Sequence, residues 1–489
     1  MYRQANDYEV IVLGSRLGGL IAGTLLAKKR HSVLLLKEKA YQTSYHRDGY
    51  QFSPFSNFSE KRLRPSLLRG ISRELGLSFL NGNLEGDTLA EKDSGQKRGK
   101  VPFQVILPKS RIDLFDDPSL SRMEWKREFP TEIPQAEAFY DELGLIQGLL
   151  KTRNQQETSS FFPVDRRPFL RKWLSFSSLP NDRTDERLSS FSWEFKKFIQ
   201  FQLISWGNLF SDSFPVALAA YLLLHKERGN WVSSMDLEGV ERELLDCFVQ
   251  SGGEIEEIER AERAEKRWRK GFTLTLEGDR RAFQGKYLIL NAPLHSFRDL
   301  LRKEGTSLSR WLETIHPRYF LVPCFFGIRE KVVPVGMRDL LVSILDPEKP
   351  YEEGNVLFLS LSPRGNERMA PEGCRALTVQ SLAPFRSWNG VSSAHRESLM
   401  NHLTHLIPFL EPYLDLSEFE WAGQQTGHWS YPHYLYEING PLRWREGVVP
   451  TRLSRNLYFI GKENFPHLGL EGEVLGGLMV AQQMLKKFS

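Results

Sequence analysis

The N-terminal segment places a strand, a glycine-containing turn, a helix and a second strand within about thirty residues. Residues 9–13 form a short run of mostly β-branched apolar residues, which is typical of a buried parallel strand. The turn at residues 14–19 contains three glycines, a helix with an apolar side follows, and residues 32–36 return as a strand. This order predicts a βαβ unit, and therefore a parallel sheet that helices cover.

The rest of the chain continues as a mixture of helices and strands. With 489 residues, of which 40% are hydrophobic and 26% charged, the chain is long enough for two globular domains. We expect residues 129–223 to be mostly helical, and further helices at 237–249, at 395–410 and from near Gly472. The strands that we expect are at residues 101–107, 111–115, 272–276, 287–292, 355–361, 375–382 and 456–461.

Charge and cysteine content exclude several classes of protein. The net charge of +4, from 65 basic and 61 acidic residues, gives no concentrated basic face of the kind that nucleic acid requires. The three cysteines, Cys247, Cys324 and Cys374, have no metal-type spacing and form no disulfide framework, which favours the reducing cytoplasm. Residues 1–8 lack a secretory signal, and no apolar run reaches the ~18–20 residues of a transmembrane helix. Peripheral contact with a membrane stays open.

Four further motifs follow the βαβ unit in an order that is characteristic of a known superfamily. They are Gly49-Tyr50-Gln51-Phe52, Gly252-Gly253-Glu254-Ile255, Asn291-Ala292-Pro293 and the closing segment 456–485. Over residues 8–485 this order resembles the phytoene desaturase, carotenoid isomerase and amine oxidase superfamily of FAD-dependent oxidoreductases. The resemblance implies an α/β fold in which a three-layer, Rossmann-like FAD/NAD(P)-binding domain with a parallel sheet carries an inserted α+β substrate domain. It implies a dinucleotide-binding domain at 1–60, 230–300 and 420–489, and a substrate domain at 61–229 and 301–419.

The resemblance also implies which residues face the cofactor. The first glycine of the turn makes a tight bend, the second lets the backbone approach the pyrophosphate, and the third allows close helix packing. Here the middle position is Arg16, the acid expected after the second strand falls on Lys37, and the acid of the closing motif is replaced by Lys462. The predicted cofactor-binding residues are Gly14, Ser15, Arg16, Gly18, Gly19, Lys37, Glu38, Gly461, Lys462 and Glu471.

These substitutions leave two outcomes open for the cofactor. Each lost charge-assisted hydrogen bond removes roughly 1.5–3 kcal/mol, so the changes at Arg16, Lys37 and Lys462 together are enough to abolish ordinary tight FAD binding. The alternative is compensation, in which Arg16 swings outward onto the pyrophosphate and Glu38 replaces the missing acid. Lys37 also resembles the basic residue that accepts an NADP 2′-phosphate, which makes NADP a less favoured third reading. The cofactor is therefore expected to be FAD or none, with NADP less favoured.

Candidates for catalysis lie shortly before the closing motif. His428 and His433 are candidate general acids or bases, Trp429 and Tyr431 candidate cavity walls, and His467 a comparable candidate beside the expected flavin edge. The alternative is that these are packed aromatics and a solvent-facing histidine in a loop. Neither a serine–histidine triad nor a metal-ligand cluster stands out in the sequence.

Two functions are consistent with these residues. The first is an FAD-dependent oxidoreductase that handles a bulky apolar, isoprenoid-like substrate, with some of the many aromatic rings of residues 129–223 as the wall of its pocket rather than as plain helical core. The second is a non-catalytic protein that has lost FAD and serves as a binding, escort or partner subunit, paired for example with an active paralogue.

Overall fold

Most of the chain is described by the computed structural model. The described residues are 7–39, 41, 43–54, 63, 65–77, 103–115, 117–154, 182–224, 237–267, 271–278, 281–298, 300–301, 305–352, 354–387, 391–419, 433–439 and 447–488.

The first of two large sheets contains the predicted βαβ unit. Its strand order is β7-β2-β1-β10-β9-β8, with β17 also paired to β10. The strands β7, β2, β1, β10 and β17 are parallel, whereas β9 and β8 extend the sheet in antiparallel fashion. The bounds are β1 (Asp7–Leu13), β2 (Val33–Glu38), β7 (Glu254–Ile258), β8 (Ala261–Arg267), β9 (Gly271–Leu276), β10 (Ala282–Leu290) and β17 (Leu457–Phe459).

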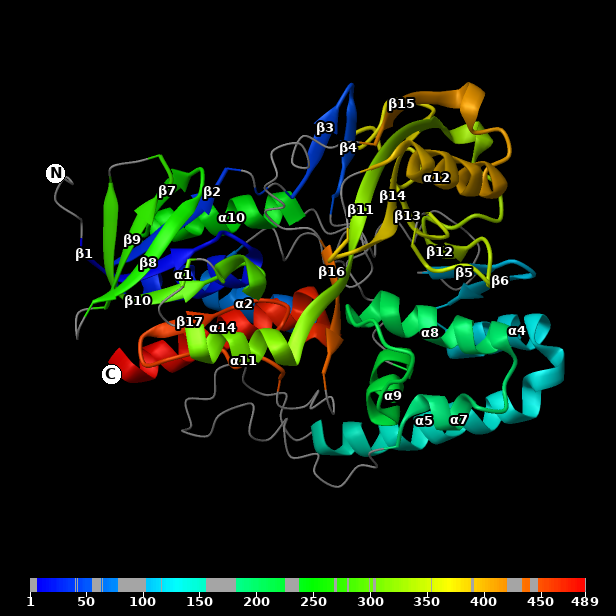
Figure 1. Cartoon of the computed structure of the whole chain (residues 1–489), viewed down its shortest axis with the longest axis horizontal. Coiled ribbons are helices and arrows are strands. Elements are labelled where there is room, and N and C mark those ends of the chain that lie inside the picture. The colour runs from blue at the N-terminus through cyan, green and yellow to red at the C-terminus, as the bar shows by residue number, and fades with distance from the viewer. Residues whose placement is uncertain are drawn as a thin grey trace.

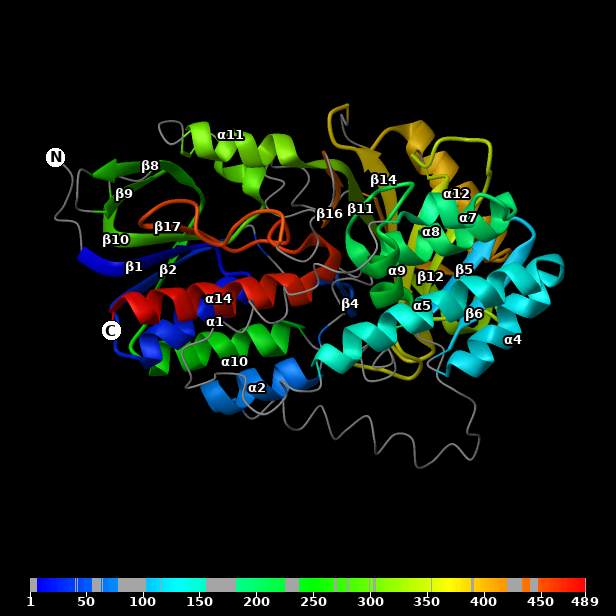
Figure 2. The same cartoon turned by 90° about the horizontal axis from the view of Figure 1, so that it is seen from below.

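Helices cover one face of this sheet. Strand β1 alternates its side chains, so that Val10 and Val12 pack under the helices while Ile11 and Leu13 join the core on the other face. Figure 2 shows the helices side by side in the order α14, α1, α10 and α2. Their bounds are α1 (Leu17–Lys28), α2 (Pro65–Leu75), α10 (Leu237–Gln250) and α14 (Leu470–Phe488). The predicted α/β fold with a helix-covered parallel sheet is confirmed.

Helices α1 and α14 approach so closely that glycine is required where they meet. A Cβ atom placed on Gly477 would clash with the carbonyl group of Gly18, which is backbone and cannot move aside. We therefore expect Gly477→Ala to lower the free energy of unfolding by about 3 kcal/mol, since overpacking outweighs the better helix propensity of alanine. Gly144 in helix α5 is the matched control, because a Cβ there meets no atom within 4 Å, and alanine should stabilise the protein slightly. Urea unfolding of both variants tests this, and equal shifts would contradict close packing of the two helices.

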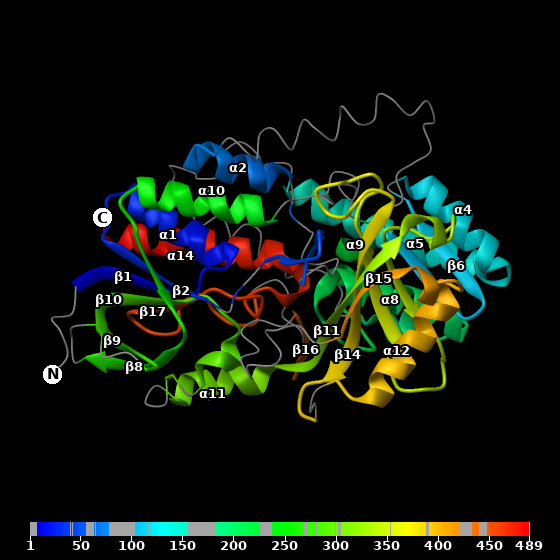
Figure 3. The same ribbon diagram turned by 90° about the horizontal axis from the view of Figure 1, so that it is seen from above.

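The second large sheet stands beside the first and is mostly antiparallel (Figures 1 and 3). Its order is β15-β11-β14-β13-β12-β5-β6, with β16 also paired to β11 and only the β12–β5 pair parallel. Helix α12 (Ser393–Leu406) packs on it, and its buried His402 accepts or donates a 2.9 Å hydrogen bond with Ser343. The bounds are β5 (Phe103–Leu107), β6 (Ser110–Leu114), β11 (Ile315–Arg329), β12 (Leu340–Ile344), β13 (Val356–Leu361), β14 (Cys374–Pro384), β15 (Leu414–Glu418) and β16 (His433–Ile438).

Shorter elements complete the architecture. Strands β3 and β4 form a hairpin of their own, and helix α11 leads directly into β11. Their bounds are β3 (Tyr45–Arg47), β4 (Tyr50–Phe52) and α11 (Gly305–Thr314). The strands of the first sheet fall within the three predicted dinucleotide-binding pieces, while β16 belongs to the second sheet. The domain division itself stays a prediction.

The predicted helical segment is rich in aromatic rings that pack on one another. Its helices are α4 (Pro118–Glu128), α5 (Ile133–Asn154), α7 (Thr184–Leu188), α8 (Trp193–Gly207) and α9 (Val216–Leu224). Phe191 stacks on Phe195 with ring centroids 4.5 Å apart, and Phe210 meets the edge of Tyr319 at 4.6 Å. The rings of Phe161, Phe162 and Trp173 lie outside the described residues. The rings of Phe191, Phe195 and Phe210 are therefore packed against other rings, and a pocket wall built from the rings of this segment stays a prediction.

Candidate functional site

The glycine turn between β1 and α1 has the geometry that the sequence predicts. Gly14 has a φ of +104°, its N–H donates to Leu36 O at 3.0 Å, and a Cβ at this position would clash with the backbone of Asn291. Arg16 is the N-cap residue of α1. The turn therefore presents the first backbone N–H groups of α1 and the positive end of its dipole at the edge of the sheet, where an anion is stabilised.

Two of those backbone donors are engaged by side chains of this chain. Gly18 N–H donates to Glu473 Oε1 at 3.3 Å, and Gly19 N–H donates to Asn291 Oδ1 at 3.1 Å. Asn291 in turn donates from Nδ2 to Ile460 O at 3.1 Å, which holds its amide in place. The carboxylate of Glu473 thus lies at the helix N-terminus, the position that favours negative charge.

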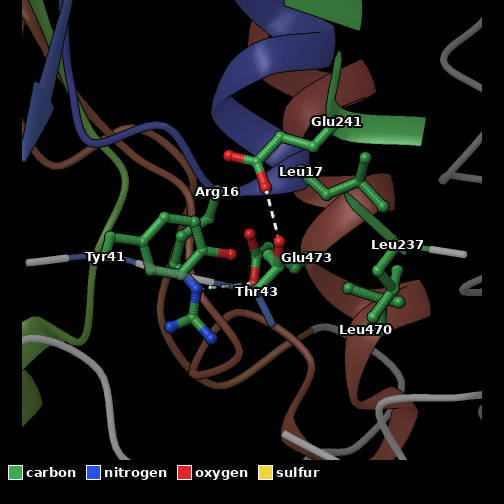
Figure 4. Close-up of a pocket in the computed structure, with 8 residues that line it drawn as sticks. All are labelled: Arg16, Leu17, Tyr41, Thr43, Leu237, Glu241, Leu470 and Glu473. Carbon is green, nitrogen blue, oxygen red and sulfur yellow. Dashed lines mark hydrogen bonds and ion pairs between the residues drawn. The ribbon is translucent and has the colours of Figure 1, made fainter. Parts of the chain in front are cut away.

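Arg16 lies inward, against the same carboxylate. Its Nε is 3.5 Å from Glu473 Oε2, and the two side chains are only 7% and 1% exposed. Figure 4 shows the guanidinium beside Glu473, with the ring of Tyr41 next to it. Desolvation raises the pKa of the Tyr41 hydroxyl, while the nearby Arg16 lowers it. The outward swing of Arg16 that compensation would require is therefore not the conformation of this structure.

A cavity of about 30 Å³ remains beside this ion pair. That volume holds about two water molecules, whereas sites for drug-sized ligands and cofactors measure ~300–1,000 Å³. Glu241 closes one side by accepting a 3.1 Å hydrogen bond from Thr43 Oγ1, and burial raises the pKa of Glu241. The lining residues are Arg16, Leu17, Tyr41, Thr43, Leu237, Glu241, Leu470 and Glu473.

The closing motif adds further buried charges. Lys462 is 3% exposed, and desolvation, helped by Arg16, lowers its pKa well below the usual value, although Glu473 and Glu463 act in the opposite direction. Burial raises the pKa of Glu463, whose Oε1 accepts a 2.8 Å hydrogen bond from Leu294 N–H. Burial therefore disfavours the charged forms of both Lys462 and Glu463, and the ion pair observed at this site is Arg16–Glu473.

The other predicted cofactor residues surround this cluster or lie at its rim. Lys37 and Glu38 are half-buried at the end of β2, opposite Glu257 and Ile258 of β7. Gly461 N–H donates to Asn464 Oδ1 at 2.9 Å. Ser15, His467 and Glu471 are each at most 2% exposed.

The predicted catalytic residues are only partly described. His428, Trp429 and Tyr431 lie outside the described residues. His433 is in β16 opposite Leu321 of β11, and desolvation together with Arg16 lowers its pKa to about 3. The imidazole is therefore neutral at ordinary pH and packed within a sheet. Its catalytic role stays a prediction.

Sequence reasoning missed the residue at the centre of the site. Glu473 lies on the same helical stripe as Gly477, Val480 and Met484, which are all small or apolar and buried. A lone carboxylate on an otherwise apolar stripe indicates a buried cationic or N–H partner. That signal was available in the sequence, although it does not say which cation is the partner.

The helix-covered parallel sheet, the glycine turn and the second sheet define the fold class of FAD-dependent oxidoreductases. A putrescine oxidase solved with putrescine aligns over 99% of this chain and 100% of its own, with a TM-score of 0.63 at 12% identity. A fatty acid isomerase from P. acnes that produces CLA aligns over 100% of both chains, with a TM-score of 0.57 at 14% identity. These likenesses show that the chain has the fold shared by FAD-dependent oxidoreductases of the phytoene desaturase and amine oxidase type.

The sequence comparison agrees with this placement. The prolycopene isomerase of Arabidopsis thaliana is 24% identical over 98% of this chain and 82% of its own length. No protein-family model matches the chain. Among the described residues, no cluster of three or more histidine, cysteine or acidic side chains is placed to hold a metal ion. No described helix is long and apolar enough to cross a bilayer.

The residues of the turn do not fit the cofactor that this superfamily implies. A pyrophosphate needs bare backbone at the middle position of the turn and free N–H groups at the N-terminus of α1. Here Arg16 occupies the first, Glu473 and Asn291 occupy the second, and the remaining cavity is about 30 Å³. The scaffold is retained, but its phosphate position is filled by the chain's own side chains.

Proposed function

We propose that this chain is a cofactor-free member of the superfamily that acts as a binding, escort or partner protein rather than as a redox enzyme. One observation carries the proposal: the carboxylate of Glu473 accepts from Gly18 N–H and pairs with Arg16 at the N-terminus of α1. The protein supplies its own anion and its own cation at the position where a dinucleotide would place its phosphates.

Electrostatic repulsion opposes binding of a diphosphate while the Glu473 carboxylate occupies this position. A diphosphate beside Glu473 would bring like charges together in a buried site, where each disfavours the charged form of the other. Its entry would also require Arg16 to leave its present partner. Of the three cationic substitutions, Arg16 is thus directed at a carboxylate of the chain itself rather than outward to a ligand.

The ligand that we infer is a long apolar molecule, or a protein that handles one. Two similar proteins are named as a prolycopene isomerase and a fatty acid isomerase. A chain that keeps the scaffold without the flavin would bind or deliver such a molecule, or would assemble with an active paralogue. The predicted cytoplasmic location stays a prediction.

The purified protein is expected to be colourless. Its spectrum should lack the near-ultraviolet and blue bands of flavin, denaturation should release no flavin, and titration with FAD should give no saturable quenching of flavin fluorescence. A putrescine oxidase prepared and titrated in the same way is the positive control. Bound flavin, or saturation at micromolar FAD, would overturn the proposal.

A second candidate is an FAD-dependent isomerase or oxidoreductase. It is supported by the 24% identity to a prolycopene isomerase across 98% of the chain and by the intact turn at Gly14. The same titration distinguishes the two, because this candidate requires saturable FAD binding by the unmodified protein.

A further inference from the structure

A cluster of exposed cations lies at the far end of the first sheet from the Glu473 site. Helix α14 runs from that site toward the C-terminus, so Lys487 lies about 21 Å along the helix from Glu473 (Figure 2). Lys487 is joined there by Lys286 of β10 and by Arg452 and Arg455, which precede β17. These four residues, from three separate chain segments, are here called the basic end.

The side chains of the basic end are held close together. Lys487 Nζ donates to the backbone oxygen of Arg455 at 2.7 Å and lies 4.4 Å from the ring centre of Tyr287. Lys286 Nζ lies 5.5 Å from the same ring, and Arg452 Nε donates to Ser454 O at 3.2 Å. All four cationic residues are exposed. Two of the cations thus share one aromatic ring, while the arginines are placed by the loop beside them.

Carboxylates do not offset these charges. No ion pair joins any of the four to an acidic side chain within the described part of the chain. Partial burial lowers the pKa of Lys487, and so do Arg452, Arg455 and Lys286. Lysine in the last turn of a helix is ordinary, since it stabilises the helix dipole, but that reason does not extend to the other three. Unoffset like charges are unfavourable in the isolated protein and become favourable when an anion binds.

The same end of the molecule carries more positive charge beside the cluster. The ring of Phe488, the residue after Lys487, lies 4.1 Å from that of His31, which directly follows the exposed run Lys28-Lys29-Arg30 at the end of α1. Two acids lie near this end and are already engaged: Glu9 accepts from His31 at 2.9 Å, and Glu254 accepts from Tyr8 at 2.7 Å. The cations are therefore spread over an open surface instead of converging on one small pocket.

From this arrangement we propose that the basic end docks the protein on an anionic phospholipid surface. The headgroup phosphates would accept charge-assisted hydrogen bonds from Lys286, Arg452, Arg455 and Lys487, with no helix inserted into the bilayer. Several spread cations suit a surface of many phosphates better than a single soluble phosphate. The inference does not rest on the proposed function, because flavin binding and membrane docking involve opposite ends of the sheet.

Co-sedimentation with vesicles tests the docking surface. The full-length protein is expected to bind phosphatidylcholine vesicles that contain phosphatidylglycerol, and not vesicles of phosphatidylcholine alone. Binding should weaken as salt is raised, since the charges are exposed. The Arg452→Gln/Arg455→Gln variant should bind at least about tenfold more weakly, because each cation near the surface contributes about a factor of five.

The control variant removes two exposed cations from the other sheet, Lys109→Gln/Arg368→Gln, and should bind as the wild type does. Far-UV circular dichroism and thermal melts verify that both variants fold. Three results would overturn the proposal: equal binding to neutral and anionic vesicles or none to either, equal loss in both variants, or complete competition by inorganic phosphate at the same ionic strength. The last result would identify a site for soluble phosphate instead.

Discussion

Replacing Glu473 with alanine is expected to lower the free energy of unfolding by about 3 kcal/mol. Removing one partner of a buried ion pair typically costs about 3–5 kcal/mol, because the other charge stays buried without its counter-ion. The lower value is expected here because Tyr41 is close enough to Arg16 to share a hydrogen bond with it. The substitution also leaves Gly18 N–H without its acceptor. Urea unfolding followed by circular dichroism measures the change.

A double-mutant cycle separates the interaction energy of the Arg16–Glu473 pair from the cost of the cavity that each truncation creates. Arg16→Gly/Glu473→Ala should destabilise the protein by clearly less than the sum of the two single variants, because it leaves no unpaired charge. The exposed pair Lys39–Glu259 is the control. Its atoms are closer, at 2.7 Å, yet the pair is exposed to water, so Glu259→Ala should leave stability unchanged within error. Unaltered stability of Glu473→Ala would mean that the carboxylate is solvated and the site open.

The βαβ unit of the first sheet could be predicted because its signals are local. A strand, a glycine turn, a helix and a strand follow one another within residues 7–38, and hydrophobic periodicity together with glycine specifies each of them. The strand pairs β5–β6 and β13–β14 are close in sequence as well, and the predicted bounds agree with the observed ones to within a few residues.

The long strand β11 could not be predicted in the same way. It contains Pro317, Pro323 and Gly327, residues that normally argue against a central strand. Pro323 nevertheless pairs with Gln380, and the register shifts after Pro317, where the ladder tolerates a missing donor. Neighbouring strands override the local preference here, and a single sequence does not show which neighbours those are.

The sequence does not determine in which direction the Arg16 side chain points at the glycine turn. The turn positions were recognised, and Arg16 was recognised as the wrong residue for a pyrophosphate. What the sequence did not show is that Gly18 meets Glu473 across 455 residues of chain. Pairs at that separation leave no periodic signal, so the direction of the Arg16 side chain, outward to a ligand or inward to a carboxylate, was left open by sequence reasoning.

Replacing Glu473 as well as the three cationic residues Arg16, Lys37 and Lys462 is expected to create FAD binding. The triple variant Arg16→Gly/Lys37→Glu/Lys462→Asp restores the residue types of a dinucleotide site but leaves Glu473 on Gly18 N–H. It should therefore bind FAD no better than the wild type. Adding Glu473→Ala frees the helix N-terminus for the pyrophosphate, and each recovered charge-assisted hydrogen bond contributes roughly 1.5–3 kcal/mol. The quadruple variant should thus bind FAD at least about tenfold more tightly than the triple variant.

The neighbouring acid Glu471 provides the matched control for this gain. It is buried in the same first turn of α14, so Glu471→Ala added to the triple variant removes an equal charge without freeing Gly18 N–H. Quenching of flavin fluorescence gives the dissociation constants, and thermal melts exclude unfolded samples. If the triple variant already binds FAD as tightly as the quadruple one, Glu473 does not hold the phosphate position, and the three cationic residues would then account for the loss of the cofactor. If instead only the Glu473 variant gains affinity, the barrier to the cofactor is the internal carboxylate that Arg16 pairs with.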